Sequence, residues 1–204
     1  MITVIDYGLG NIGSIENMLK KIGAAVKVTS KIEEIEKAEK LILPGVGAFD
    51  SGMRNLEENG LIPVLNRKVI EQKTPILGIC LGFQLFTKES EEGSLKGLGW
   101  LNARTVKFKF EGVDVRTKIP HIGWNPVYIK KASPLFDNMP DDPRFCFVHS
   151  YHVVCDEKDD ILTETDYVYN FVSSAQKNNI FGVQFHPEKS HKFGMSLLKN
   201  YMGI

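Results

Sequence analysis

The sequence predicts an α/β protein with a central sheet that is mixed but mostly parallel, has helices on both faces and carries an antiparallel extension. Two observations support this fold class. In the first 90 residues, short apolar runs alternate with amphipathic helical patterns, as in parallel strands joined by crossover helices. Beyond residue 93, strand-like segments follow one another with few helices between them, which indicates antiparallel pairing.

Length and charge restrict the range of functions. A chain of 204 residues can bury one sizeable core, so we expect residues 1–204 to form a single domain whose topology changes near residue 90. The 25 lysine and arginine residues balance 25 aspartate and glutamate residues. We therefore expect no basic surface for nucleic acid or for an anionic membrane.

The cysteines and the N-terminus indicate a cytoplasmic protein. Cys80, Cys146 and Cys155 are odd in number and widely spaced, which predicts free thiols in a reducing compartment and no structural metal site. The sequence begins directly in a strand-like run without a charged leader, and no apolar stretch is long enough to cross a membrane. We therefore expect a cytoplasmic location.

Each apolar run in the first part is predicted to be a buried strand that leads into a helix. Gly23 ends the first helix, and Pro63 lies in the first turn of a later one, where proline is tolerated. The predicted strands are residues 2–5, 26–28, 41–43 and 75–79, and the predicted helices are residues 12–22, 32–37, 50–59, 61–72 and 81–88.

The second part is predicted to consist mainly of strands. A turn at Asn178 and Asn179 precedes the last buried strand, and a helix over residues 189–202 closes the chain. The predicted strands are residues 103–110, 126–130, 145–154, 169–175 and 180–185.

A glycine-rich turn follows the first strand. Its pattern Gly8-x-Gly10-x-x-Gly13 has the letters of a dinucleotide-binding fingerprint, but the second strand runs into Thr29 and Ser30 and not into the acidic residue that would bind a ribose. A tight strand-to-helix turn at the carboxyl edge of the sheet fits better, and nucleotide binding stays as the alternative.

A candidate nucleophile lies at the end of the fourth strand. Residues 75–79 lead through the frame Gly78-x-Cys80-x-Gly82 into a predicted helix, the layout of a nucleophile elbow, in which side chains larger than glycine would collide with neighbouring backbone. The thiol would also lie at the positive end of that helix, where amide dipoles stabilise a thiolate. The alternative is a buried core cysteine.

A thiolate nucleophile needs a base, and the base needs an orienting group. Among five histidines, only His186 directly follows a predicted buried strand and has a carboxylate two residues later. Pro187 prevents a regular helix, so Glu188 can fold back onto the imidazole and fix its tautomer. The alternative for this tripeptide is a surface turn.

An oxyanion hole requires backbone amides that point at the developing charge. One donor is expected to be the amide of Leu81, the residue after the nucleophile. The turn formed by residues 44–47 can supply the second, because its two glycines allow its peptide planes to reorient. An ordinary β-turn is the alternative for this segment.

Taken together, these motifs resemble a known family. Residues 78–84 and 185–188, in this order, are similar to the motifs of triad-class (class I) glutamine amidotransferases, which have a flavodoxin-like fold. More narrowly, the chain resembles the glutaminase subunits of imidazole glycerol phosphate synthase. The segments that carry this resemblance are residues 6–11, 43–49, 90–93, 121–125, 147–151 and 186–190.

The resemblance implies roles for individual residues. Cys80 would attack the side-chain carboxamide of L-glutamine, His186 would act as base and then as acid, and Glu188 would orient His186. No cofactor or metal would take part. The amides of Leu81 and, after a peptide flip, of Val46 would donate hydrogen bonds to the oxyanion. Glutamine would be bound by Gly47, Gln84, Ser150 and Tyr151. The partner would be contacted by Trp124, Asn125 and Lys189.

The resemblance also implies a partner. Ammonia would pass to a (β/α)8-barrel cyclase subunit, which makes imidazole glycerol phosphate and an aminoimidazole carboxamide ribonucleotide in histidine biosynthesis. We interpret Gly123-Trp124-Asn125 as a loop that displays an aromatic residue to this partner.

Two alternatives stay open. Cys146 stands where the family usually has an aromatic residue at the subunit interface, so the ammonia could instead serve a barrel synthase that amidates a surface-sugar precursor. A non-catalytic interaction protein of the same fold is the other alternative, against which the intact set of Cys80, His186 and Glu188 argues.

Overall fold

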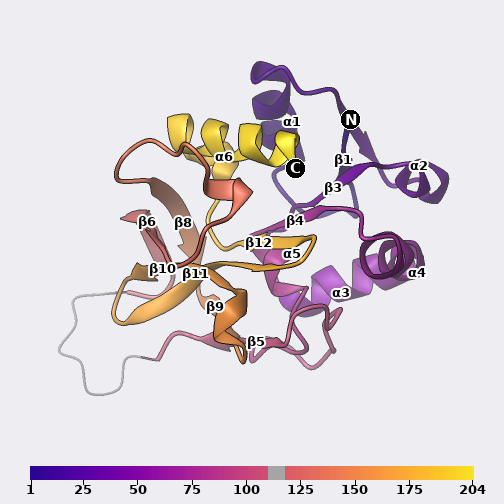
Figure 1. The fold of residues 1–204 in the computed structure, drawn as a ribbon. Helices are drawn as coiled ribbons and strands as arrows, with labels where there is room; N and C mark the ends of the chain where they lie inside the picture. The colour runs from indigo at the N-terminus through magenta and orange to yellow at the C-terminus, as the bar shows by residue number, and fades with distance from the viewer. Residues whose placement is uncertain (110–117) are drawn as a thin grey trace.

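Strands and helices alternate in the first part of the chain, as predicted (Figure 1). The computed structural model describes residues 1–109 and 118–204, so the end of the strand predicted over residues 103–110 lies outside the described residues. The elements of the first part are β1 (Ile2–Ile5), α1 (Ile12–Lys21), β2 (Val26–Thr29), α2 (Ile32–Glu36), β3 (Lys40–Leu43), α3 (Phe49–Glu58), α4 (Leu61–Asn66), the π-helical η1 (Arg67–Glu71), β4 (Ile76–Ile79) and α5 (Leu81–Gln84).

The second part consists mainly of strands and ends in a long helix. Its elements are β5 (Ala103–Lys107), β6 (His121–Pro126), β7 (Tyr128–Ile129), the 3-10 turn η2 (Pro134–Phe136), β8 (Arg144–His149), β9 (Tyr151–Cys155), the 3-10 turn η3 (Lys158–Asp160), β10 (Ile161–Asp166), β11 (Asn170–Lys177), β12 (Ile180–Val183), the 3-10 turn η4 (Pro187–Lys189) and α6 (His191–Gly203).

The central sheet is mixed, which confirms the predicted fold class. Its strand order is β2-β1-β3-β4-β12-β11-β10-β7, and the strands from β2 to β12 are parallel. The strands β11, β10 and β7 continue the sheet in antiparallel fashion, and β9 pairs with β11 and β5. Because β4 and β12 are parallel neighbours, the residues that follow both strands emerge at the same edge of the sheet.

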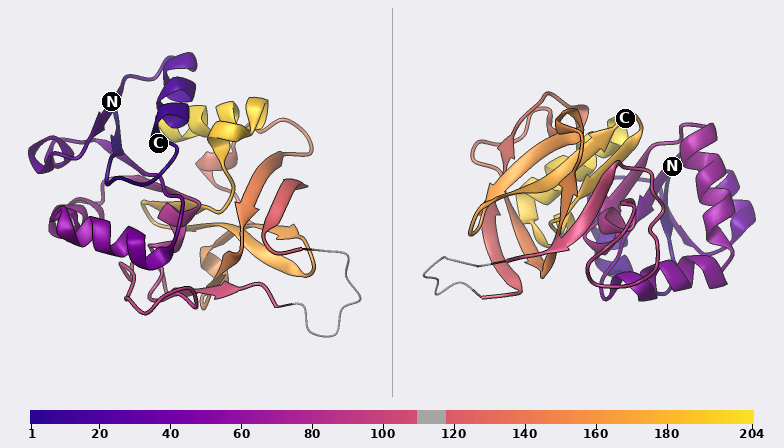
Figure 2. Two further views of the ribbon diagram at one scale, coloured as in Figure 1. Left: turned by 180° about the vertical axis from the view of Figure 1, so that it is seen from behind. Right: turned by 90° about the horizontal axis from the view of Figure 1, so that it is seen from below.

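Helices cover both faces of the parallel strands (Figures 1 and 2). Successive side chains of a strand point to opposite faces. Val4 and Ile42 therefore join an apolar cluster with α1 and α6, whereas Ile5 and Leu43 join a second cluster with α3 and α4. The first cluster also contains Phe145, so the second part of the chain contributes to it.

The helix predicted over residues 81–88 is wrong in length, because α5 has only four residues. The amide of Thr87 bonds to the carbonyl of Gln84, and the amide of Lys88 bonds to the carbonyl of Ala103. The chain thus leaves the helix after one turn and bonds to the start of β5 and to the segment before it, where the amide of Leu98 donates to the carbonyl of Leu85. A single turn has few aligned peptide dipoles, so the helix dipole contributes less to the thiol than the sequence suggested.

Two further predictions in the second part are wrong. The strand predicted over residues 145–154 is two strands that belong to different sheets, because the chain bends at Ser150, β8 pairs with β6, and β9 pairs with β5. The segment Gly123-Trp124-Asn125, interpreted as a loop, is the middle of β6. We call the two-stranded sheet of β6 and β8 the ribbon. The strand β10 was not predicted.

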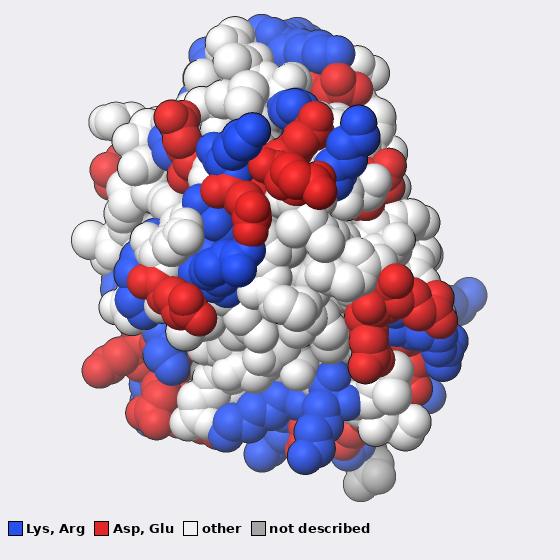
Figure 3. Space-filling model, turned by 90° about the vertical axis from the view of Figure 1, so that its right-hand side faces the viewer, with Lys and Arg blue, Asp and Glu red and all other residues white. Residues whose placement is uncertain are grey.

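The surface carries charges of both signs. Acidic and basic side chains are interspersed at the end of the molecule where α2 and α4 lie (Figure 3), so this face has no continuous basic field. Within residues 1–109 and 118–204, no helix is both long and apolar enough to cross a membrane.

Candidate active site

Cys80 occupies a strained turn between β4 and α5. Its φ of 53° and ψ of −108° are unusual for a residue other than glycine, and strain of this kind is typical of functional sites. A Cβ atom on Gly78 would lie 2.6 Å from the Phe86 ring, and one on Gly82 would overlap the carbonyl oxygen of Leu43. The glycine frame is therefore a steric requirement, as predicted for an elbow.

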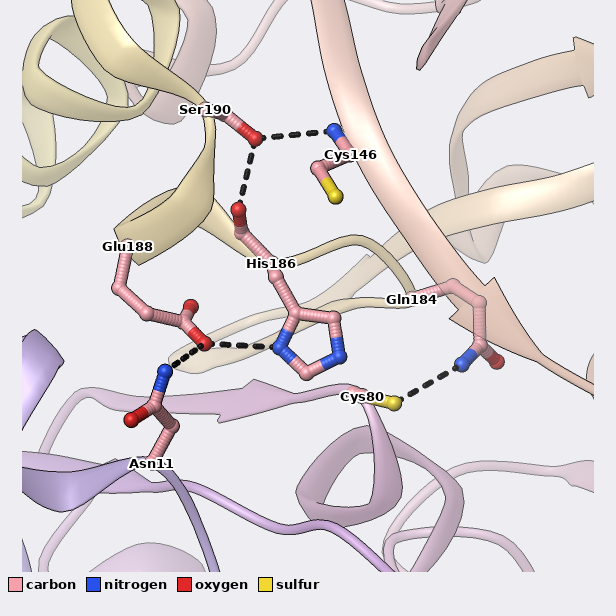
Figure 4. Close-up of polar contacts among 7 residues, drawn as sticks. All are labelled: Asn11, Cys80, Cys146, Gln184, His186, Glu188 and Ser190. Atoms are coloured by element: carbon pink, nitrogen blue, oxygen red, sulfur yellow. Dashed lines mark hydrogen bonds and ion pairs between the residues drawn. The ribbon is translucent and has the colours of Figure 1, made fainter. Parts of the chain in front are cut away.

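His186 lies beside Cys80, although the two residues belong to different strand ends (Figure 4). The amide of Cys80 donates to the carbonyl of Val183 at 2.8 Å, which joins the elbow to the end of β12. His186 Nδ1 lies 2.8 Å from Glu188 Oε1. A carboxylate only accepts, so Nδ1 carries the proton, and Figure 4 shows the ring between this carboxylate and the sulfur.

The backbone of His186 is clamped to β8. Its amide donates to the carbonyl of Cys146 at 2.9 Å, and the Ser190 hydroxyl donates to its carbonyl at 2.6 Å. The same hydroxyl accepts from the amide of Cys146 at 3.0 Å. The ribbon therefore positions the imidazole, a contact that the sequence did not reveal.

The electrostatics favour a protonated imidazole. Burial alone would lower the pKa of His186, but its hydrogen bonds with Cys80 and Glu188, together with their negative charge, outweigh burial and raise the pKa to about 10. An imidazolium at this place stabilises negative charge on the sulfur, which is the form in which a thiol attacks carbonyl carbon.

Glu188 is buried behind His186 and is contacted by the glycine-rich turn. Asn11 Nδ2 donates to Glu188 Oε1 at 3.5 Å, and Glu188 Oε2 has no hydrogen-bond partner among the described residues. A Cβ atom on Gly10 would lie 2.9 Å from Pro44. The turn after β1 thus packs on both the third triad residue and the expected oxyanion segment, which agrees with a tight structural turn.

The predicted oxyanion donors lie at the mouth of the elbow. The amide of Leu81 donates to the carbonyl of Gly45 at 3.3 Å. Val46 is exposed, and Gly47 has a φ of 101°, which is favourable for glycine. The hydroxyl of Tyr7 is buried next to Gly45 and has no hydrogen-bond partner among the described residues. Burial and the nearby Cys80 raise the pKa of Tyr7, so its hydroxyl is a neutral donor.

A pocket of about 370 Å³ opens over Cys80. It brings together most of the predicted site residues, including the expected glutamine-binding residues and Lys189, whereas Glu188 lies behind it and Trp124 and Asn125 lie outside it. Its lining consists of Val46, Gly47, Cys80, Leu81, Gln84, Glu92, Pro120, Val148, His149, Ser150, Tyr151, His186 and Lys189.

Sequence reasoning missed a second glutamine in the site. Gln84 Nε2 donates to the carbonyl of Tyr151 at 3.0 Å and to Gln184 Oε1 at 3.1 Å, and Gln184 Nε2 donates to Cys80 Sγ at 3.7 Å. Gln184 is fully buried beyond the end of β12. The available signal was a polar residue inside an apolar run, because such a residue needs a buried partner.

The expected partner-contact residues lie on the surface. Trp124 is 44% exposed on β6, opposite Cys146 of β8, and its ring stacks on His191 with centroids 5.3 Å apart. Lys189 is exposed at the rim of the pocket, and Asn125 is half-buried. Their role in binding a partner stays a prediction.

Known proteins are similar to this chain in sequence and in fold. The family model for class-I glutamine amidotransferases matches residues 3–202. The protein named imidazole glycerol phosphate synthase subunit HisH 2 of Methanococcus maripaludis is 58% identical and covers 99% of this chain and 98% of its own, and that of Pseudomonas aeruginosa is 50% identical over the whole of both chains. The structure of PurLQS from Thermotoga maritima shares the fold with a TM-score of 0.69 at 16% identity, covering 99% of this chain and 97% of its own. The chain therefore belongs to the class-I glutamine amidotransferase family and, within it, to the HisH group of subunits.

Proposed function

We propose that this chain is the glutaminase subunit of an imidazole glycerol phosphate synthase and supplies ammonia for histidine biosynthesis. The single observation that carries the chemistry is the strained Cys80 elbow, which shares one pocket with His186 while Glu188 is buried behind the imidazole. The names of the two relatives support the pathway. A cytoplasmic location accords with the free thiols.

The chemistry follows from the arrangement of the three groups. The sulfur of Cys80 attacks the carboxamide carbon of glutamine, and the C–N bond breaks as His186 gives its proton to the departing ammonia. A glutamyl thioester remains on Cys80. His186 then takes a proton from water, the hydroxide attacks the thioester carbon, and glutamate leaves as the thiolate is restored. Glu188 keeps the imidazole in one tautomer throughout.

The oxyanion site requires a change in the turn before α3. The amide of Leu81 is engaged by the Gly45 carbonyl in this structure. Rotation of the Gly45–Val46 peptide releases that amide and turns the amide of Val46 towards the developing charge. The rotated carbonyl of Gly45 then needs a donor, and the unpartnered hydroxyl of Tyr7 lies beside Gly45.

We assign the substrate and the partner to different residues. Gly47, Gln84, Ser150 and Tyr151 are proposed to hold glutamine in the pocket. The ammonia then passes to a (β/α)8-barrel cyclase. Trp124, Asn125 and Lys189 are proposed to contact this subunit.

Substitution of the nucleophile tests the proposal. In the complex with the cyclase subunit, Cys80→Ala is expected to reduce glutamine-dependent synthesis by at least about 10³-fold and to retain ammonia-dependent synthesis. Cys155→Ala is the matched control, because Cys155 lies outside the pocket, and both activities should persist. Glutamine-dependent synthesis by Cys80→Ala at the wild-type rate would refute the thiol assignment.

An alternative acceptor is favoured by one observation. Cys146 lies opposite Trp124 on the ribbon, at the position where an aromatic residue is expected near the ammonia route. A barrel synthase that amidates a surface-sugar precursor would then be the partner. Complementation of a histidine auxotroph that lacks this subunit separates the two pathways, since failure despite good expression of the protein would favour the sugar pathway.

A further inference from the structure

A chain of buried polar groups links the ribbon to the nucleophile. Asn125 Oδ1 lies 2.9 Å from His121 Nε2, and His121 Nδ1 lies 3.1 Å from His149 Nε2. His149 Nδ1 lies 2.7 Å from the carbonyl oxygen of Tyr151. We call these four groups the histidine relay. The Tyr151 carbonyl also accepts a hydrogen bond from Gln84. Gln84 donates in turn to Gln184, and Gln184 donates to Cys80 Sγ.

The direction of the relay is fixed at its inner end. A carbonyl oxygen can only accept, so His149 Nδ1 must carry a proton to bond with Tyr151. In a neutral ring the other nitrogen, Nε2, is then a bare acceptor. It can be satisfied only if His121 Nδ1 carries a proton, which leaves His121 Nε2 bare and facing Asn125. The Asn125 amide must therefore present its NH2 group.

The structure shows the opposite orientation of this amide. Asn125 Oδ1 faces His121, and Asn125 Nδ2 donates to the carbonyl of Asp166 at 3.4 Å. With two neutral rings, this orientation leaves one pair of acceptors in contact, at Asn125 Oδ1, between the rings or at the Tyr151 carbonyl. One additional proton on either ring would satisfy every contact. A half-turn of the amide would satisfy the relay, and it would give up the hydrogen bond from Asn125 to the Asp166 carbonyl.

Burial disfavours the additional proton. It lowers the pKa of His121 and lowers that of His149 well below the usual histidine value. The other titratable groups near the pair are His152 on β9, His186 before η4 and Tyr167 after β10. The nearby histidines oppose a further positive charge. The neutral relay is therefore complete only after the amide turns.

We propose that His121 and His149 are positioning residues, and that a half-turn of the Asn125 amide completes the relay and fixes the Tyr151 carbonyl and Gln84 for glutamine binding. This inference rests on the proposed function, in which Asn125 meets the cyclase subunit. A partner that forms no hydrogen bond with the Asn125 amide would leave the relay unchanged. A donor that engages Asn125 Oδ1 would draw the oxygen outwards and turn the NH2 group towards His121.

Histidine tautomers give a readout that is independent of activity. The full chain, labelled with ¹⁵N-histidine, is studied by NMR alone and in complex with the cyclase subunit. In the complex, His121 and His149 are both expected to be neutral and protonated at Nδ1, although free histidine prefers Nε2. Neutral His149 protonated at Nε2 in the complex would overturn the relay, since it could not bond to Tyr151.

A second arm tests the outer end of the relay. In the Asn125→Asp variant, the carboxylate can only accept a hydrogen bond from His121. At alkaline pH the complex should therefore show a glutamine KM that is raised about tenfold, because one buried hydrogen bond is lost. The defect should diminish as the pH falls, because a proton on His149 restores all contacts. Ile122→Ala, an exposed neighbour on β6, is the matched control and should show no such pH dependence.

A double-mutant cycle tests the connection itself. His149→Asn retains a donor for the Tyr151 carbonyl, but its side chain is too short to place an acceptor where Nε2 meets His121, so it should remove the pH-dependent part of the Asn125→Asp defect. Additive effects on KM would overturn the relay. If neither the wild-type complex nor any variant hydrolyses glutamine, but His121 and His149 have the expected tautomers, the proposed function fails and the relay stands.

Discussion

The backbone amide of Leu81 donates a hydrogen bond to the carbonyl oxygen of Gly45, with an N···O distance of 3.3 Å. The amide that is proposed to bind the oxyanion is therefore already occupied. Loss of one oxyanion donor costs about 10² to 10³ in kcat in other enzymes. We predict that glutamate release by the isolated chain is slow and rises by about 10²-fold or more when the cyclase subunit and its ligand bind. Rapid turnover without the partner would contradict a closed turn.

The hydroxyl of Tyr7 is expected to act only in the open turn. Since this hydroxyl has no hydrogen-bond partner within residues 1–109 and 118–204, Tyr7→Phe should leave the unfolding free energy unchanged or raise it by up to about 1 kcal/mol. In the activated complex, the same variant should lower kcat by about threefold to tenfold, because the rotated carbonyl of Gly45 loses its donor. Denaturant unfolding and steady-state kinetics test both parts. A stability loss with unchanged kcat would assign Tyr7 to packing alone.

The glycine frame provides a matched pair of substitutions. Gly82→Ala should lower the free energy of unfolding by about 2 to 5 kcal/mol, because the new methyl group overlaps the carbonyl of Leu43 in the sheet. Gly13→Ala on α1 meets no atom within 4 Å, so it should leave stability unchanged or raise it by up to about 1 kcal/mol. Urea denaturation of the two variants gives the comparison, and equal stability would exclude a steric role for Gly82.

The raised pKa of His186 predicts a pH dependence of stability. The folded-state pKa of about 10 lies above the usual value of 6.5, so the folded protein retains a proton that the unfolded chain releases between these values. This contribution is complete below about pH 6.5 and is lost as the pH rises towards 10. The stability advantage of the wild type over His186→Gln should therefore fall by at most about 1.4 kcal/mol per pH unit in this window.

The same window should contract in the Cys80→Ala variant, because part of the shift arises from the interaction with Cys80. Thermal or chemical unfolding across the window, with His186→Gln in both backgrounds, measures this change. An advantage of the wild type that does not vary with pH would contradict a protonated His186 in the folded state.

The parallel half of the fold and the proximity of Cys80, His186 and Glu188 could be predicted from the sequence because local signals coincide there. Buried strands are followed by helices at regular intervals, and Gly78, Cys80 and Gly82 form a frame whose steric reason lies within a few residues. His186 and Glu188 are close in the chain and are joined by a proline turn. Such short-range constraints are present in the sequence itself.

The parts that were missed depend on contacts between distant segments. Gly123 and Asn125 resemble loop residues, yet they form a strand because β8 supplies the pairing. The length of α5 is set by bonds to the segment before β5, and the Leu81 amide is engaged by a turn from another strand. Gln184 and the buried pair of His121 and His149 acquire their partners only when segments that are distant in the sequence meet.

The ribbon lies apart from the central sheet, and the chain passes from β8 to β9 through Ser150 alone. Its outer face can therefore change without disturbing the strands that carry the elbow. This separation allows one glutamine-cleaving core to be adapted, in evolution or by grafting of the ribbon, to acceptor enzymes of different shape. Such an exchange keeps two requirements: the carbonyl of Cys146 must still hold His186, and the inner side of β6 must still present a ring to His149.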